Sequence, residues 1–180
     1  MIFKAIEFAA RAHAGQYRKG TNIPYIVHPL GVAKILIEYG SPDHMTIAGI
    51  LHDTIEDTPI TLEQIKAIFG SAVADLVEAA SEPDKSDTWE NRKEHTIEHL
   101  KTLPHETVIL ALADKLDNIR AIREDLERNG EDLWGRFNRP REQQKWYYES
   151  LVSVISARLT DENSLPLIDL FRREVIRVFG

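Results

Sequence analysis

Helix signals recur along almost the whole chain, and they constrain the fold more than any other feature of the sequence. Residues 2–13 place apolar side chains at helical spacing and stop before Gly15. The run IPYIV is the only strand-like one, and Pro24 and Pro29 crowd it too closely for a sheet. We therefore predict an all-α chain, with further helices over residues 28–40, 41–54, 61–70, 71–81, 89–102, 105–125, 140–159 and 165–179.

The ends of several predicted helices carry their own signals. Pro29 suits a first helical position, where its missing N–H costs nothing. Ser41 is predicted to cap the helix that follows. Thr61 and Gln64 have the spacing of a capping box, and Gly70 is predicted to end that helix.

The chain has 180 residues, without an internal repeat or a linker of domain-boundary length, so we predict one domain over 1–180. Two polar stretches, 81–93 and 128–140, are predicted to be mobile loops. The aromatic cluster at 146–148 is predicted to belong mainly to the core, with base stacking as the alternative.

Charge and composition narrow the range of partners. With 22 basic and 29 acidic side chains the formal net charge is -7, which argues against broad binding to nucleic acid or anionic membranes but leaves room for a small phosphorylated ligand. There is no cysteine, and thus no disulfide or thiol nucleophile. The first residues mix charges into an amphipathic pattern unlike a signal peptide, and no apolar run approaches the ~20 residues of a membrane span. We therefore predict a cytoplasmic protein.

The segment HDTIEDT, residues 52–58, gathers charge directly after the apolar run IAGIL. With about 100° between successive helical residues, four of its side chains fall within about 140° of one face. Burying that face without partners would cost several kcal/mol per charge, so a cation should meet it. The sequence therefore predicts a divalent metal beside His52, Asp53, Glu56 and Asp57.

Two residues elsewhere could complete such a site. His28 begins a predicted helix, and Asp114 follows the apolar run VILALA. Each alone has an ordinary explanation, because a His before Pro is usually a helix cap and an Asp in an apolar helix is usually a buried hydrogen-bonding group. Together with His52 and Asp53 they supply two imidazoles and two carboxylates, a mixture suited to Mn²⁺, Fe²⁺ or Zn²⁺.

The remaining candidates would act around that metal. Glu56 and Asp57 could orient or deprotonate its water, the alternative being solvated helix-end residues. Arg18 and Lys19 could pair with phosphate, the alternative being a solvated loop. Asn118 lies one turn beyond the last predicted ligand and could bond a ribose or a metal-bound water, the alternative being an ordinary polar surface residue.

Four segments occur here in the order and spacing seen in HD-domain hydrolases of the Rel/SpoT type: HAGQYRKGTNIPYIVHPLGVAKIL, AGILHDTIEDT, FGSAVADLV and LALADKLDNIR. The chain resembles this family over about residues 5–155, most of all its short, stand-alone members, the small alarmone hydrolases. The resemblance implies a single HD-domain helical bundle, with 156–180 as a C-terminal helical extension. Long relatives add a synthetase domain, for which the about 25 residues after the match leave no room.

The resemblance also implies a function. Such enzymes remove the 3′-pyrophosphate of guanosine tetra- or pentaphosphate (ppGpp or pppGpp), the alarmones of the stringent response, leaving GDP or GTP. In this family four side chains hold the ion, usually Mn²⁺, two acids handle the water, and several polar residues contact the nucleotide. The corresponding residues are His28, His52, Asp53 and Asp114 for the ion, Glu56 and Asp57 for the water, and Arg18, Lys19, Asn118 and Arg141 for the nucleotide.

Two departures from the family pattern leave the base open. Gly20 and Thr21 replace the usual Ser or Ser-Gly after Arg-Lys, and Asp117 replaces a residue that is often His or Tyr. Both lie near the predicted nucleoside pocket. An adenosine 3′-pyrophosphate (ppApp), the 2′-phosphate of NADPH or a nucleoside monophosphate is therefore an alternative substrate, and a non-catalytic sensor of alarmone or metal is the alternative of another class. The oligomeric state is open.

Overall fold

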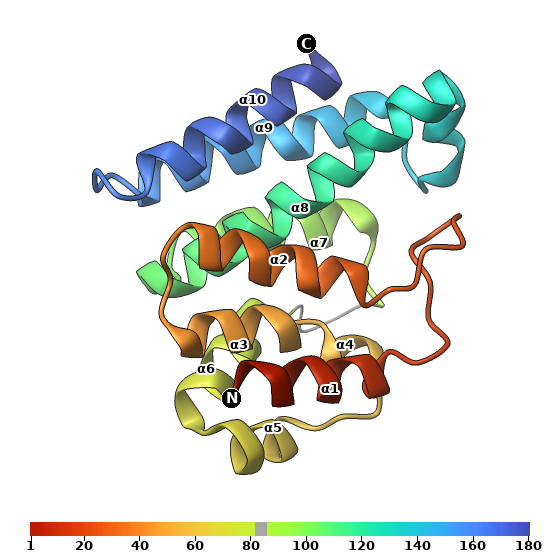
Figure 1. The fold of residues 1–180 in the computed structure, drawn as a ribbon. Coiled ribbons are helices and arrows are strands. Elements are labelled where there is room, and N and C mark those ends of the chain that lie inside the picture. Colours follow the sequence, from red (N-terminus) through yellow and green to blue (C-terminus); the bar gives the residue numbers. More distant parts are fainter. Residues whose placement is uncertain (82–85) are drawn as a thin grey trace. The chain divides into compact units, whose positions relative to one another are not determined.

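The computed structural model describes residues 1–81 and 86–180. Over this part of the chain the all-α prediction is confirmed: there is no named strand, only an isolated antiparallel bridge between Tyr17 and Pro24 (Figure 1). The helices are α1 (Ile2–Ala12), α2 (Val27–Glu38), α3 (Asp43–Leu51), α4 (Thr54–Asp57), α5 (Leu62–Phe69), α6 (Ser71–Ala80), α7 (Trp89–Leu100), α8 (His105–Asn129), the 3₁₀ helix η1 (Gly130–Arg136), α9 (Arg141–Arg158) and α10 (Leu165–Phe179). None of these helices is long and apolar enough to cross a membrane.

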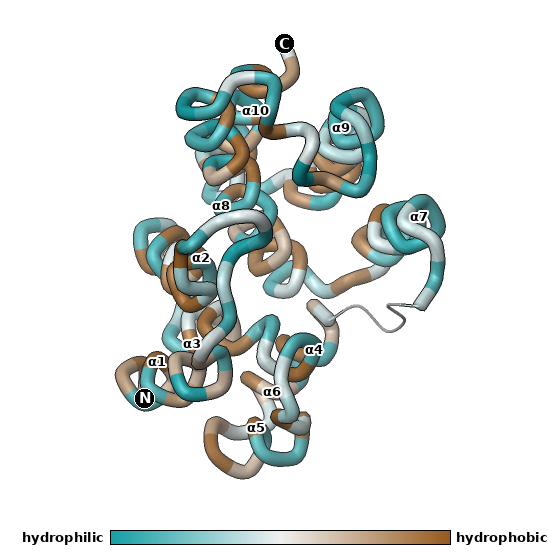
Figure 2. The backbone as a smooth tube through the Cα atoms, turned by 90° about the vertical axis from the view of Figure 1, so that its right-hand side faces the viewer, coloured by the Kyte–Doolittle hydropathy of each residue, from teal (hydrophilic) through white to brown (hydrophobic). Residues whose placement is uncertain are grey.

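The chain divides into two compact units, Met1–Pro83 and Asp84–Gly180. In the first unit α3 is the central helix, packed against α1, α2 and α6. Every residue from Met45 to Leu51 is buried, as expected of a helix that is apolar all round (Figure 2). The IAGIL run is therefore core, and it leads directly into the charged segment that follows it.

In the second unit the 25-residue helix α8 packs against α9, α10 and η1, while α7 packs against α9. Fully buried side chains such as Leu112, Leu116 and Phe171 form its core. Glu174 is 4% exposed and is bound by Arg123 at 2.8 Å and by Arg177 at 3.1 Å, which compensates the buried charge.

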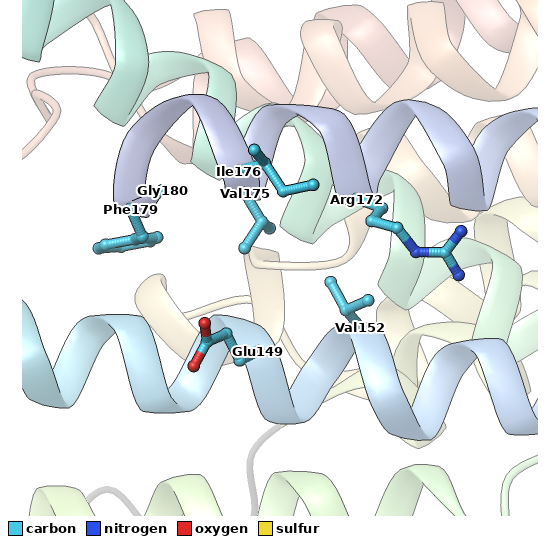
Figure 3. Close-up of a pocket in the computed structure, with 7 residues that line it drawn as sticks. All are labelled: Glu149, Val152, Arg172, Val175, Ile176, Phe179 and Gly180. Carbon is cyan, nitrogen blue, oxygen red and sulfur yellow. The ribbon is translucent and has the colours of Figure 1, made fainter.

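A small cavity of about 160 Å³ lies between α9 and α10 within this second unit (Figure 3). Four apolar side chains, one acid and one base line it, namely Val152, Val175, Ile176, Phe179, Glu149 and Arg172. It contains none of the side chains for which the sequence predicts a function.

The ends of the first helices agree only partly with the sequence. The Thr61–Gln64 capping box is present, and Gly70 ends α5 with φ of +92°, a conformation in which other residues are strained. The predicted cap at Ser41 is wrong, because Pro42 precedes α3 in extended conformation. The prediction that Pro29 starts its helix is also wrong: α2 begins at Val27, and a proline is tolerated anywhere in a first turn whose N–H groups have no helical partner.

Two predictions in the second half also need correction. The loop predicted over 128–140 is wrong for most of its length, because α8 continues to Asn129 and Gly130–Arg136 form η1. Buried Leu133 and an ion pair between Arg136 and Asp125 at 3.3 Å hold η1 against α8. Of the loop predicted over 81–93, residues 82–85 lie outside the described residues, and α7 already begins at Trp89.

The aromatic cluster splits between core and surface. Tyr147 and Tyr148 are 4% and 5% exposed, which confirms them as core. Trp146 is 41% exposed, so its assignment to the core was wrong. Three successive helical residues span about 200° around the axis, which is too wide for all three to face one core.

Candidate metal and catalytic site

His52 and Asp53 lie at a break between two helices, whereas the sequence predicted one continuous helix. α3 ends at Leu51 and α4 begins at Thr54, although both residues between them keep right-handed helical dihedrals. The Thr54 hydroxyl donates to the carbonyl of Leu51 at 2.6 Å, a local bond that competes with regular helix bonding. The four residues therefore do not lie on one continuous helix: His52 and Asp53 form the junction, and Glu56 and Asp57 lie on α4.

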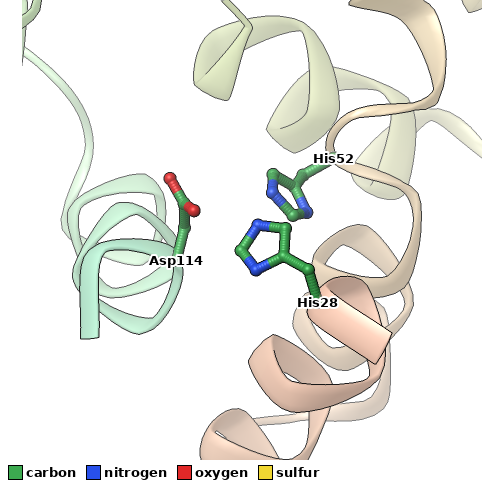
Figure 4. A group of neighbouring side chains, drawn as sticks. All are labelled: His28, His52 and Asp114. Carbon is green, nitrogen blue, oxygen red and sulfur yellow. The ribbon is translucent and has the colours of Figure 1, made fainter. Parts of the chain in front are cut away.

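Two buried imidazoles meet at this corner. His28, from the first turn of α2, is 3% exposed and His52 is 5% exposed, with ring centroids 5.1 Å apart (Figure 4). His52 Nδ1 lies 2.8 Å from the carbonyl oxygen of Gly49. Because a carbonyl oxygen only accepts, Nδ1 carries the proton and Nε2 presents a lone pair, which is the form that binds a metal.

One carboxylate oxygen of Asp53 faces both imidazoles. Asp53 Oδ2 lies 3.1 Å from Nε2 of His52 and 3.5 Å from Nε2 of His28. The carboxylate is only 16% exposed, so water does little to screen its charge. Three of the four predicted ligands thus lie close together within the first unit, and the two imidazole nitrogens and the carboxylate oxygen face one another.

Tyr25 is a fourth member of this cluster, and the sequence analysis gave it no role. Its hydroxyl donates to the same Asp53 oxygen at 2.6 Å, and its ring lies edge-on to His28. Burial, then the charge of Asp53 and the hydrogen bond to it, raise the pKa of the Tyr25 phenol, so the hydroxyl keeps its proton and acts as the donor. The available signal was its place one helical turn before His28 in YIVHP.

The two further acids follow on the next short helix. Glu56 is half-buried and Asp57 is exposed, both on the four-residue α4. The amide of Asp57 donates to the carbonyl of Asp53 at 3.0 Å, so it stands one turn beyond that residue. Their role as acceptors of a proton from water stays a prediction.

The predicted phosphate contacts Arg18 and Lys19 lie in the loop between α1 and α2. The Arg18 guanidinium stands 5.8 Å from the centre of the Tyr25 ring, and its amide donates to Ile23 at 2.9 Å. Lys19 is exposed. Arg18 is thereby placed beside the cluster, next to the tyrosine that contacts Asp53.

In the second unit, Asp114 lies on α8 with two close partners. Asn118 donates to its Oδ1 and Lys115 to its Oδ2, both at 2.6 Å. The two predicted residues thus do share a face. Lys115 was overlooked, although it stands beside Asp114 in LADK. Burial works to lower the pKa of Lys115, but the charge of Asp114, the hydrogen bond to it and the neighbouring Tyr147 and Tyr148 together outweigh burial and keep the lysine pKa well above its usual value.

Arg141, predicted to face the phosphates, is occupied inside the second unit. It starts α9, and its Nη2 donates to the carbonyl of Val178 near the end of α10 at 3.2 Å. Its guanidinium also lies within about 6 Å of the rings of Trp134 and Phe179. These contacts give it a structural role, and a phosphate contact stays a prediction.

A family model described as "HD domain" matches residues 5–142. The chain belongs to the HD-domain family. The matched span contains the adjacent His52 and Asp53 as well as His28 and Asp114, so every predicted metal ligand of this HD-domain chain lies inside it.

One relative resembles the chain over nearly its full length. The guanosine-3′,5′-bis(diphosphate) 3′-pyrophosphohydrolase MESH1 of Danio rerio is 36% identical over 175 residues, covering 96% of this chain and 94% of that protein. Longer relatives from Synechocystis and Aquifex aeolicus also match, and this chain spans 17% and 18% of their lengths.

Two solved structures are similar as well. The crystal structure of lmo0812 from Listeria monocytogenes EGD-e gives a TM-score of 0.79 at 39% identity, covering 84% of this chain and 98% of that one. A structure described as a metazoan ortholog of SpoT that hydrolyzes ppGpp gives a TM-score of 0.76 at 28% identity, covering 96% and 94%.

Proposed function

We propose that this chain is a metal-dependent hydrolase that removes the 3′-pyrophosphate of ppGpp or pppGpp to give GDP or GTP and pyrophosphate. The observation that carries the proposal is the convergence of His28, His52 and Asp53 in a chain whose full-length relative is named for this reaction. A buried carboxylate between two imidazoles has little use in a core unless a cation meets it.

The ligands of that ion would be His28, His52 and Asp53 from the first unit and Asp114 from the second. The donor set fits a divalent metal with positions left for other ligands, and Mn²⁺ is proposed ahead of Fe²⁺ or Zn²⁺ because it is the usual ion of the family the chain resembles. When bound, such an ion polarises a phosphoryl oxygen and makes nearby water more acidic. Asp114 is proposed from its motif, LADKLDN.

The chain's own residues would perform the proton and binding steps. Glu56 or Asp57 accepts the proton of a water whose oxygen attacks the proximal phosphorus of the 3′-pyrophosphate. The bond from that phosphorus to the 3′-oxygen breaks, and the 3′-oxygen takes up a proton to become a hydroxyl. Arg18 and Lys19 would balance the charge of the pyrophosphate, Arg in a bidentate pair and Lys as a point charge.

Asn118 and Arg141 are proposed as further substrate contacts. Asn118 already bonds Asp114, so it could orient that ligand as well as the ribose. Arg141 would first have to give up its bond to the Val178 carbonyl, which makes it the weaker of the two proposals.

The test is turnover of ppGpp by the purified, folded chain, stripped of metal and then supplied with Mn²⁺. We expect GDP and pyrophosphate in equal amounts, resolved by anion-exchange chromatography. Orthophosphate as the product, or faster turnover of ppApp, NADPH or a nucleoside monophosphate in the same assay, would reject the substrate and keep the metal site. Binding of ppGpp without turnover by a metal-loaded chain would establish a sensor in place of an enzyme.

A further inference from the structure

The loop between α1 and α2 reaches the catalytic segment through a side-chain amide. Gln16 Nε2 donates to the backbone carbonyl of Asp57 at 2.7 Å, across 41 positions of sequence. On its other side Gln16 Oε1 lies 2.8 Å from Nδ1 of His13, which is 3% exposed. One side chain therefore joins the end of α1 to the end of α4.

The orientation of this amide follows from its two partners. The Asp57 carbonyl only accepts, so the group facing it must be the NH₂ of Gln16. The amide oxygen then faces His13, whose Nδ1 must carry the proton and donate. The two hydrogen bonds therefore point the same way: His13 donates to Gln16, and Gln16 donates to Asp57.

The carbonyl that Gln16 reaches belongs to the last residue of α4. α4 is a single turn of four residues, too short to be stable by itself, and the last carbonyls of any helix lack an N–H within that helix. The Thr58 hydroxyl satisfies the carbonyl of Thr54 at 2.6 Å, and Gln16 satisfies that of Asp57. These bonds fix where the turn ends.

A second bond joins the same loop to a predicted metal ligand. The Tyr25 hydroxyl donates to Asp53 Oδ2 at 2.6 Å, across 28 positions. The two arms support each other, because the His13 and Tyr25 rings pack with centroids 4.9 Å apart. The loop is therefore hydrogen-bonded to the segment 52–57 at two places, the side chain of Asp53 and the backbone carbonyl of Asp57.

We propose that His13, Gln16 and Tyr25 form a brace whose task is to position this segment for hydrolysis. Gln16, backed by His13, sets the direction of the turn that carries Glu56 and Asp57, and Tyr25 sets the orientation of Asp53. The three are positioning residues, since none carries an atom that reacts. The inference rests on the proposed function for its catalytic consequence and on the geometry alone for its structural one.

The Gln16 arm is tested with Gln16→Ala against Gln64→Ala. The control also removes one exposed hydrogen bond between a glutamine side chain and the backbone: the Thr61 amide, at the start of α5, donates to Gln64 Oε1 at 2.9 Å. We expect Gln16→Ala to lower kcat for ppGpp about tenfold with KM within about twofold, because the substrate contacts stay while the acids lose their placement. Gln64→Ala should keep both constants.

Amide hydrogen exchange tests the structural role of Gln16 independently of enzyme activity, and so independently of the proposed function. In Gln16→Ala the amides of residues 54–58 should exchange at least about tenfold faster than in Gln64→Ala, whereas the amides of the buried helix α3 should exchange alike in both variants. If the wild type does not turn over ppGpp, the proposed function fails while the exchange result still decides the brace. Equal exchange in the two variants, or an unchanged kcat in an active enzyme, overturns the Gln16 arm.

The Tyr25 arm is tested by titrating Mn²⁺ alone into Tyr25→Phe and Tyr17→Phe by calorimetry. Tyr17 belongs to the same loop but is 59% exposed, so its variant is a matched loss of one hydroxyl. Loss of a hydrogen bond to a metal ligand typically weakens metal binding about 10- to 100-fold, and we expect this for Tyr25→Phe only. Equal affinity in the two variants, or no Mn²⁺ binding by the wild type, overturns this arm.

Discussion

Replacing Asp53 by Asn should uncouple the stability of the protein from divalent metal without destabilising the metal-free chain. In the structure one Asp53 oxygen lies 3.1 Å and 3.5 Å from two imidazole nitrogens, with the Tyr25 hydroxyl as its donor at 2.6 Å. An asparagine that places its carbonyl oxygen at this position can still accept from Tyr25, and it removes a negative charge from the buried cluster. The metal-free variant should therefore stay within about 1 kcal/mol of the wild type.

The metal-bound states should differ by much more. A ligand that binds only the folded state adds about 2.7 kcal/mol at a concentration of about 100 times its Kd. If the variant binds about a hundredfold more weakly, the same concentration adds only about 0.4 kcal/mol. For a chain of this size about 1 kcal/mol moves Tm by roughly 2–4 °C, so Mn²⁺ should raise Tm by roughly 5–11 °C in the wild type and by roughly 1–2 °C in Asp53→Asn.

Differential scanning calorimetry with and without Mn²⁺ measures both quantities. Asp43→Asn is the matched control, since Asp43 is an exposed acid in the first turn of α3 and should keep the wild-type metal response. Equal metal-induced shifts in Asp53→Asn and the wild type would refute the assignment of Asp53 as a ligand. A metal-free Asp53→Asn that unfolds far below the wild type would show that the carboxylate is needed for the fold itself.

Three further predictions concern the second unit. Hydrogen bonds to Asp161, first from Ser164 and then from His105, lower the pKa of this carboxyl from 3.8 to about 2, so the stabilisation they give is present above pH 3.8 and is lost as the pH falls toward 2. The difference in unfolding free energy between the wild type and Asp161→Asn, measured by urea titration, should therefore narrow over this pH range, and a constant difference would contradict the prediction. Glu174→Ala leaves two arginines without their buried acid and should cost about 3 kcal/mol by chemical denaturation, with less than about 1 kcal/mol as the contrary result. Phe171→Ala opens a cavity in a fully buried position and should cost about 3–5 kcal/mol in the same measurement, whereas a loss below about 1 kcal/mol would place it outside the core.

The helices could be predicted because local rules and packing agree along most of this chain. Apolar spacing, the box at Thr61 and the glycine at 70 all report on residues within a few positions of one another. The errors arise where contacts and side-chain bonds that apolar spacing does not record decide the structure. Nothing local says that Leu133 will be buried against α8 and turn a predicted loop into η1, and periodicity could not show that a Thr54 hydroxyl would break the helix at His52.

The candidate site was predictable in its residue types but not in its supports. His28, His52 and Asp53 stand out because charged or imidazole groups in apolar surroundings need an explanation. Gln16 and Tyr25 do not stand out, since a glutamine in a loop and a tyrosine in an apolar run are ordinary. Their bonds span 41 and 28 positions, and no sequence period records a contact of that length.

The break between α3 and α4 divides the segment 52–57 into a part that is held firmly in place and a part that can be reoriented more easily. His52 directly follows α3, in which every residue from Met45 to Leu51 is buried, so moving its imidazole would require moving the core of the first unit. Glu56 and Asp57 sit on a single turn that is held mainly by side-chain bonds and can be re-aimed by changing one of them. A metal site tolerates little displacement of its ligands, whereas acids that serve a water must fit each substrate. Substitutions that loosen the core should therefore reduce metal affinity first, and substitution of Gln16 should reduce kcat first.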